Sequence, residues 1–153
     1  MNIGLPDESR SAVINLLQPL LAAHAVLGMQ TRAAHWRLVD PLFKPLHEWL
    51  GSQYEALEEQ TDELAERIRT LGRQPISTVK EFSTVSPLAE SLPSENSAAV
   101  WLKLLLAHRE TLIGHLRSSV DSAGSAGDSG TKDFLTGIME DHEKTAWMLR
   151  SSI

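Results

Sequence analysis

Apolar residues recur at three- and four-residue steps along four long stretches of the chain, which is the spacing of amphipathic helices. The first stretch runs from Pro6 to Arg37, and Pro19 in its interior is expected to bend the helix. The second runs from Pro45 to Leu71, where Gly72 is a suitable helix-ending residue. One stripe of the second stretch carries its apolar pattern: Leu46, Leu50, Leu57, Leu64, Ile68 and Leu71.

The pattern breaks over residues 75–93, although residues 78–82 have a composition that suits one or two helical turns. A third helix is predicted from Ser94, a suitable N-cap, to about Ser122. The small residues 123–127 predict a second break.

A fourth helix is expected to begin between Asp128 and Thr131 and to continue to the end of the chain. Its pattern is carried by Phe134, Leu135, Ile138, Trp147 and Met148. Two helical hairpins joined by one long crossover form the ferritin-like bundle topology. The prediction is therefore all-α: residues 1–153 form a single ferritin-like four-helix bundle, with a short extra helix in the crossover between the second and third helices.

The chain carries 20 acidic and 14 basic residues, giving a net charge of −6, and it contains no cysteine. The excess of negative charge disfavours nucleic acids and anionic membranes as partners and favours cations. The absence of cysteine excludes disulfides and thiolate metal sites, and it suits a cytoplasmic protein. No secretion signal and no membrane-spanning segment are expected.

Two carboxylates on the second helix are candidates for binding a cation. Asp62 and Glu66 are four residues apart, so both can reach one ion. Asp62 lies about 160° around the helix from Leu64, on a face that points away from the bundle core. A solvated helix face is the ordinary alternative for such a pair.

His47 precedes Asp62 on the same helix and lies about 60° from it in projection, but roughly 22 Å away along the axis. One chain cannot easily bring both residues to one metal ion. A shared site requires a second subunit lying antiparallel across this face, and a two-fold axis then generates two equivalent sites.

His35 ends the first helix and His47 opens the second, so the turn between the helices can bring the two histidines together. Two histidines from one chain and the Asp62 and Glu66 pair from its partner would form a mixed nitrogen and oxygen site suited to Fe(II), Zn or Mn. Helix capping is the alternative role for each histidine.

The sequence around these residues resembles the Dps family of ferritin-like proteins nearly end to end. Four segments carry the resemblance: Thr31–Trp36 (TRAAHW), Leu46–Glu48 (LHE), Asp62–Ile68 (DELAERI) and Asp141–Lys144 (DHEK). It implies a homododecameric shell that oxidises Fe(II), normally with peroxide, and stores ferric oxide against oxidative stress. The implied two-iron site consists of His35 and His47 from one subunit and Asp62 and Glu66 from the other.

The resemblance also suggests roles for three further residues. Trp36 corresponds to a tryptophan beside the iron site that is oxidised in place of diffusing radicals, although burial at an interface is the alternative. Asp128 and Asp133 would line a pore that admits Fe(II), since carboxylate rings suit hydrated divalent cations. The alternatives are helix capping by Asp128 and a favourable first-turn charge at Asp133.

Gly51 departs from the family pattern, which usually has an acidic residue one turn after the second histidine. Gly51 faces the expected site but offers no ligand, and a glycine inside a helix costs about 1 kcal/mol relative to alanine. Three interpretations remain: the second iron position is weakened, Glu48 or Glu55 substitutes, or another histidine enters the centre. The remaining candidate, His24, lies roughly 16 Å from His35, so a hydrogen-bonded interface histidine is the expected alternative.

Two other classes of function remain for comparison. Loss of the acidic ligand at Gly51 would leave a non-catalytic shell with an empty or zinc-occupied site. A di-iron oxidase with its centre inside one bundle needs Glu-x-x-His pairs, and no glutamate here precedes a histidine by three positions. DNA binding is not expected, because residues 1–10 contain one arginine beside two acidic residues and thus lack a cationic tail.

Overall fold

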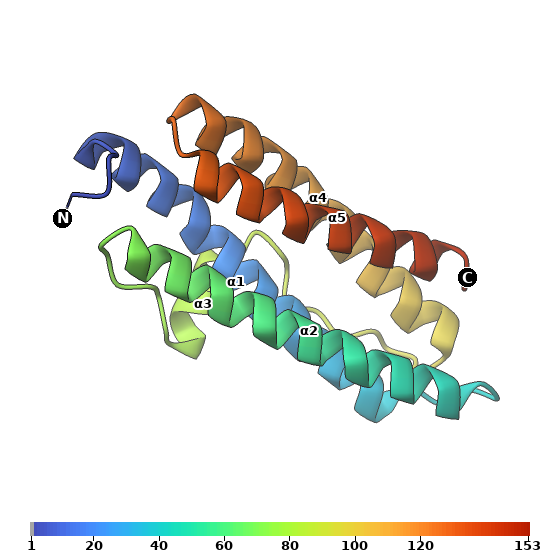
Figure 1. The fold of residues 1–153 in the computed structure, drawn as a ribbon. Coiled ribbons are helices and arrows are strands. Elements are labelled where there is room, and N and C mark those ends of the chain that lie inside the picture. Colours follow the sequence, from blue (N-terminus) through green and yellow to red (C-terminus); the bar gives the residue numbers. More distant parts are fainter. Residues whose placement is uncertain (1) are drawn as a thin grey trace.

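Five helices make up the regular structure of residues 2–153, the part of the chain that this computed structural model describes. They are α1 (Asp7–Arg37), α2 (Phe43–Thr70), α3 (Val79–Val85), α4 (Ala98–Ser125) and α5 (Ser129–Arg150). No strand occurs within these residues. The predicted all-α architecture is confirmed, including the short helix in the crossover (Figure 1).

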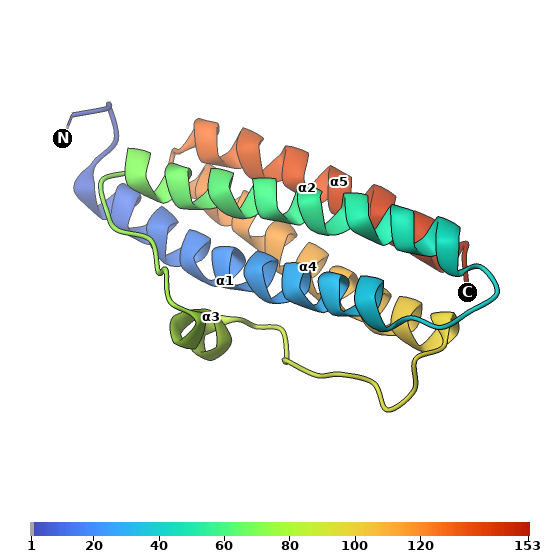
Figure 2. The ribbon, with the colours of Figure 1, turned by 90° about the horizontal axis from the view of Figure 1, so that it is seen from below.

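The four long helices form two hairpins, α1 with α2 and α4 with α5, and the hairpins meet chiefly where α1 packs on α4. The crossover runs along the outside of the bundle, from the end where α2 stops to the opposite end where α4 starts (Figure 2). Helix α3 lies within this crossover and packs on α1.

Helix α3 starts with a capping box, which explains why so short a segment is helical. The Thr78 hydroxyl accepts a hydrogen bond from the Glu81 backbone N–H at 3.2 Å, and the Glu81 carboxylate accepts from the Thr78 N–H at 2.9 Å. Each side chain therefore satisfies a backbone donor at the start of the helix.

The boundaries of α4 differ from the prediction at both ends. It begins at Ala98, because the preceding segment is extended and its Asn96 carbonyl accepts a hydrogen bond from Val39 N–H at 2.8 Å. At the other end α4 continues to Ser125, through most of the predicted break. Gly127 then adopts a positive φ of 79°, the left-handed conformation with which many helices terminate.

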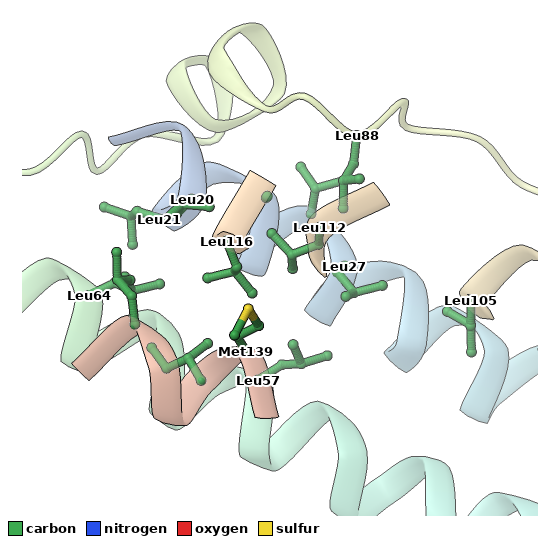
Figure 3. Close-up of a cluster of buried hydrophobic side chains, with 14 of the residues drawn as sticks. Leu20, Leu21, Leu27, Leu57, Leu64, Leu88, Leu105, Leu112, Leu116 and Met139 are labelled. Atoms are coloured by element: carbon green, nitrogen blue, oxygen red, sulfur yellow. The ribbon is translucent and has the colours of Figure 1, made fainter. Parts of the chain in front are cut away.

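Leucine side chains from all four long helices fill the space between them (Figure 3). Leu21, Leu64 and Leu116 approach one another there from α1, α2 and α4, with Met139 of α5 beside them. Leu88 reaches the same core from the crossover. In contrast, Trp147 belongs to the apolar pattern of the fourth helix but is 59% exposed in the single chain.

Helix α1 is long and apolar enough to cross a membrane, by length and composition only. Length and composition alone do not distinguish a membrane span from a buried helix. The helix continues through Pro19, and more than half of its most apolar stretch is buried against the rest of the bundle. Burial on several sides explains the composition, since a helix that is apolar over most of its surface suits the core of a bundle.

Candidate metal centre

His35 and His47 form a closely packed pair at the end of the α1–α2 hairpin. Their imidazole rings stack with centroids 3.6 Å apart and planes inclined by 19°. The Nδ1 atom of His35 lies 2.7 Å from the His47 carbonyl oxygen, and the Nδ1 atom of His47 lies 2.9 Å from the His35 carbonyl oxygen. The structure thus brings together the two histidines that the sequence predicted to meet.

These reciprocal contacts show that Nδ1 of each ring carries a proton. A carbonyl oxygen only accepts hydrogen bonds, so each Nδ1 must carry a proton and donate. In a neutral imidazole the proton on Nδ1 leaves Nε2 with its lone pair. Hydrogen bonds of this kind commonly orient metal-binding histidines, so the pair presents two nitrogen atoms that can act as ligands.

Aromatic side chains hold the pair in place on both sides. Phe43 at the start of α2 lies 5.0 Å from His47 between ring centroids. Tyr54 meets His35 edge to face at 5.3 Å, and the Arg32 guanidinium lies 4.5 Å above the tyrosine ring. Both histidines remain partly exposed, so their rings are ordered but still accessible from outside the bundle.

Gly51 lies one turn beyond His47 and faces the His35 ring, as the helical projection predicted. A Cβ atom at this position would lie 3.6 Å from Cε1 of His35, which is an ordinary van der Waals contact. The glycine is therefore not required by crowding. It leaves space for a further group beside the histidine pair.

Asp62 and Glu66 are exposed on the outer face of α2, away from the buried Leu64. Asp62 borders a hollow of about 620 Å³ between α2 and the crossover, together with Glu55, Glu58 and Glu59. Within residues 2–153, no three histidine, aspartate or glutamate side chains are arranged to hold a metal ion. The structure therefore does not bring the histidine pair and the carboxylate pair together in one chain.

Several large apolar side chains are exposed on α1 and on the turn that follows it. Trp36 is 63% exposed, although it directly follows His35. The other exposed apolar side chains on α1 and the turn after it are Met29, Val39 and Leu42. Large exposed apolar side chains that gather in one region commonly mark a protein interface.

A buried polar network in the bundle core includes residues that the sequence interpretation did not assign. Arg109 of α4 donates to Nδ1 of His142 at 3.0 Å and to the Gln53 side-chain oxygen at 3.2 Å. Nε2 of His142 lies 3.1 Å from Nε2 of His24, whose Nδ1 contacts the Leu20 carbonyl at 2.7 Å. His24 is thus a core residue of its own bundle and does not enter the centre formed by His35.

The network determines the charge of its members. Because arginine only donates, His142 accepts at Nδ1, donates from Nε2 to His24, and His24 in turn donates to the Leu20 carbonyl. Burial lowers the pKa of His24 to about 4 and that of His142 well below its usual value, with the Arg109 charge adding to both shifts. Both histidines are therefore neutral near pH 7. All three side chains occupy otherwise apolar helix stripes, and this signal was present in the sequence.

Asp128 is almost fully buried, at 3% exposure, and its contacts favour the capping role over pore lining. Its carboxylate accepts hydrogen bonds from the Thr131 backbone N–H at 2.9 Å and from the Arg67 guanidinium at 2.9 Å. Asp133 is exposed on the first turns of α5, as is Asp121 near the end of α4. The exposed Asp133 and Asp121 are therefore accessible to solvated cations, and the buried Asp128 is not.

The sequence matches the ferritin-like domain family over residues 14–153. It is 46% identical over its full length to a low temperature-induced protein of Nostoc described as uncharacterized, of which it covers 86%. It is 32% identical to DNA protection during starvation protein 2 of Bacillus anthracis, covering 91% of this chain and 94% of that protein. The crystal structure of a Dps protein from Vibrio cholerae, described as ferritin-like and diiron-carboxylate, is 29% identical and superimposes with a TM-score of 0.93, covering 99% of this chain and 95% of that one.

Proposed function

This chain belongs to the Dps family of ferritin-like proteins, and from that premise we propose that it is a ferroxidase that oxidises Fe(II) and stores the ferric product. The observation that carries the proposal is the His35 and His47 pair, which presents two Nε2 lone pairs at the surface of the bundle. Asp62 and Glu66, on the helix α2 that also carries His47, would supply the oxygen ligands that ferric iron prefers.

The complete site is proposed to form between two antiparallel subunits. His35 and His47 of one chain then face Asp62 and Glu66 of the other, and the two-fold axis creates a second identical site. The exposed Trp36 would be covered in this arrangement, which explains why a large aromatic side chain is left on the surface of the single chain.

Fe(II) is the substrate at this site. Two Fe(II) ions each lose one electron, and one hydrogen peroxide molecule accepts both electrons with two protons to give two water molecules. Neutral histidine ligands bind Fe(II), and the carboxylates stabilise the higher charge that develops on Fe(III). Because both electrons are accepted within one site, the peroxide is reduced without the release of hydroxyl radical.

Trp36 is proposed to limit damage when a radical does form. Its indole ring adjoins His35 and is therefore the nearest readily oxidised side chain in sequence to the iron ligands. Its oxidation would consume a radical before the radical leaves the interface.

We propose a homododecameric shell as the storage form, with ferric oxide inside it. Asp133, which is exposed near the start of α5, is the residue proposed to line an entry pore for Fe(II). Asp128 instead holds the N-terminus of α5 and the neighbouring Arg67 in place.

DNA binding by direct contact is not part of the proposal, although several relatives carry DNA protection in their names. The net charge of −6 opposes association with a phosphate backbone. Removal of iron and peroxide protects DNA without contact between the two molecules.

A non-catalytic shell is the alternative, because Gly51 provides no ligand beside the histidine pair. Stopped-flow absorbance of the ferric product separates the two functions, using protein loaded anaerobically with Fe(II) and then mixed with peroxide. Wild-type protein is expected to oxidise Fe(II) at least tenfold faster than a variant that combines His47→Ala with Asp62→Ala, as expected for the loss of ligands. Equal rates for the two proteins would favour the inert shell.

A further inference from the structure

The antiparallel arrangement that brings His47 opposite Asp62 also determines which other residues meet across the interface. In two antiparallel helices, residues at the same level have position numbers with a constant sum. The pair of positions 47 and 62 gives the same sum as 51 and 58. In the register that sets His47 level with Asp62, Gly51 of one subunit is level with Glu58 of the other.

Glu58 also points toward the same side of the helix as the residues of the site. It lies four residues before Asp62, so the two side chains differ by about 40° in projection, and Gly51 lies between their directions. Its side chain is 70% exposed and borders the same hollow as Asp62. The carboxylate is thus accessible to a neighbouring subunit.

Space for this carboxylate exists beside the histidine pair. A Cβ atom added at Gly51 would meet nothing closer than the His35 ring at 3.6 Å. Any larger residue at position 51 would occupy the volume directly opposite Glu58. In this register, the space left by the missing side chain at Gly51 therefore lies opposite the Glu58 side chain of the other subunit.

Glu58 is held by a weak interaction in the single chain. One carboxylate oxygen lies 3.0 Å from the Arg32 guanidinium, which also stacks on Tyr54. An exposed ion pair of this kind contributes little to stability, so binding to a divalent ion can replace it.

The two other glutamates considered for this role fit less well. Glu48 follows His47 directly and points about 100° away from it, and its carboxylate lies 4.0 Å from Lys44. Glu55 lies on the correct face, but it is level with Tyr54 of the other subunit and so roughly 4.5 Å beyond Gly51 along the helix.

We propose that Glu58 reaches across the interface into the space at Gly51 of the opposite subunit and binds the second Fe(II) ion there. The assignment rests on the proposed ferroxidase function and adds a third carboxylate to the site. Asp62, Glu66 and Glu58 then form a row of three carboxylates from one subunit that faces the histidine pair of the other.

Anaerobic isothermal titration calorimetry of the assembled protein with Fe(II) tests this assignment without relying on activity. Each site of the wild-type protein is expected to bind two Fe(II) ions. In Glu58→Gln the affinity for one of the two is expected to fall by about tenfold or more, as is usual when a metal site loses a supporting group. Arg32→Gln is the matched control, since it breaks the same ion pair but keeps the carboxylate. Glu55→Gln is the control for the general loss of negative charge, and both controls are expected to bind two ions as the wild type does.

A rescue variant tests the position directly. Gly51→Asp combined with Glu58→Gln places a carboxylate on the opposite side of the same space, and it is expected to restore the second ion, whereas Gly51→Ala with Glu58→Gln is not. Two ions bound by Glu58→Gln as tightly as by the wild type would overturn the role of Glu58 and leave the proposed function intact. A wild-type protein that binds no more Fe(II) than His47→Ala would overturn both.

Discussion

His35 and His47 each donate a hydrogen bond from Nδ1 to the backbone carbonyl of the other, at 2.7 Å and 2.9 Å. The reciprocal bonds join the last turn of α1 to the second turn of α2, and they orient both rings. They also leave both Nε2 atoms available, so the same contacts that fold the hairpin prepare its ligands.

The protonation state of this pair is directly measurable. In the metal-free protein, long-range ¹H–¹⁵N NMR spectra are expected to show the rings of both His35 and His47 protonated at Nδ1. Addition of Zn(II), which is diamagnetic, is expected to shift Nε2 of both rings and leave Nδ1 protonated. Rings protonated only at Nε2 in the metal-free protein would contradict the hydrogen bonding described above.

The buried histidines predict that the free energy of unfolding depends on pH. His24 and His142 have lowered pKa values in the folded chain, to about 4 for His24, whereas in the unfolded chain each titrates near its ordinary value of 6.5. The unfolded state therefore binds more protons below pH 6.5, and the free energy of unfolding decreases as the pH falls from 6.5 towards 4. Each histidine contributes a slope of up to about 1.4 kcal/mol per pH unit in this window.

Urea denaturation between pH 8 and pH 4.5 provides the measurement for this dependence. His24→Gln is expected to show a shallower decrease than the wild type. His115→Gln, a change at an exposed histidine, serves as the control and should leave the slope unchanged. A wild-type stability that stays constant down to pH 4.5 would be inconsistent with neutral buried histidines.

Asp128 and Asp133 are expected to differ sharply in their effect on folding. Asp128→Ala removes both the cap of α5 and the partner of Arg67, and it should lower the free energy of unfolding by about 3 kcal/mol. Asp133→Ala changes an exposed side chain and should alter stability by less than about 0.5 kcal/mol. Thermal melting of the two variants checks the contrast, and equal small effects would argue against the structural role of Asp128.

The helices and their order were predictable because apolar spacing reports which face of each helix is buried. The start of α4 was misplaced because Ser94 resembles an N-cap, whereas the backbone there is extended and the Asn96 carbonyl accepts a hydrogen bond from Val39. Such contacts between distant segments leave no local mark in the sequence.

The histidine pair was predictable because a short turn between helices restricts where its ends can lie. The network of His24, Arg109 and His142 was not predicted, since His24 and His142 are 118 residues apart and only the packing of α1, α4 and α5 brings the three together. The sequence indicates this network only by placing polar residues on otherwise apolar helix faces. Which residues meet across the interface depends on a second subunit, and for this reason the role of Asp62 and Glu66 stays a prediction.

Subunit mixing tests most directly the claim that one site is shared by two chains. His47→Ala and Asp62→Ala proteins are each expected to be inactive, but after they are dissociated, mixed in equal amounts and reassembled, about a quarter of the sites contain both wild-type residues. The rate of peroxide-dependent Fe(II) oxidation, averaged over all sites, should then recover to about a quarter of the wild-type rate. A mixture as inactive as its two components, in assemblies shown to contain both subunits, would contradict the shared site.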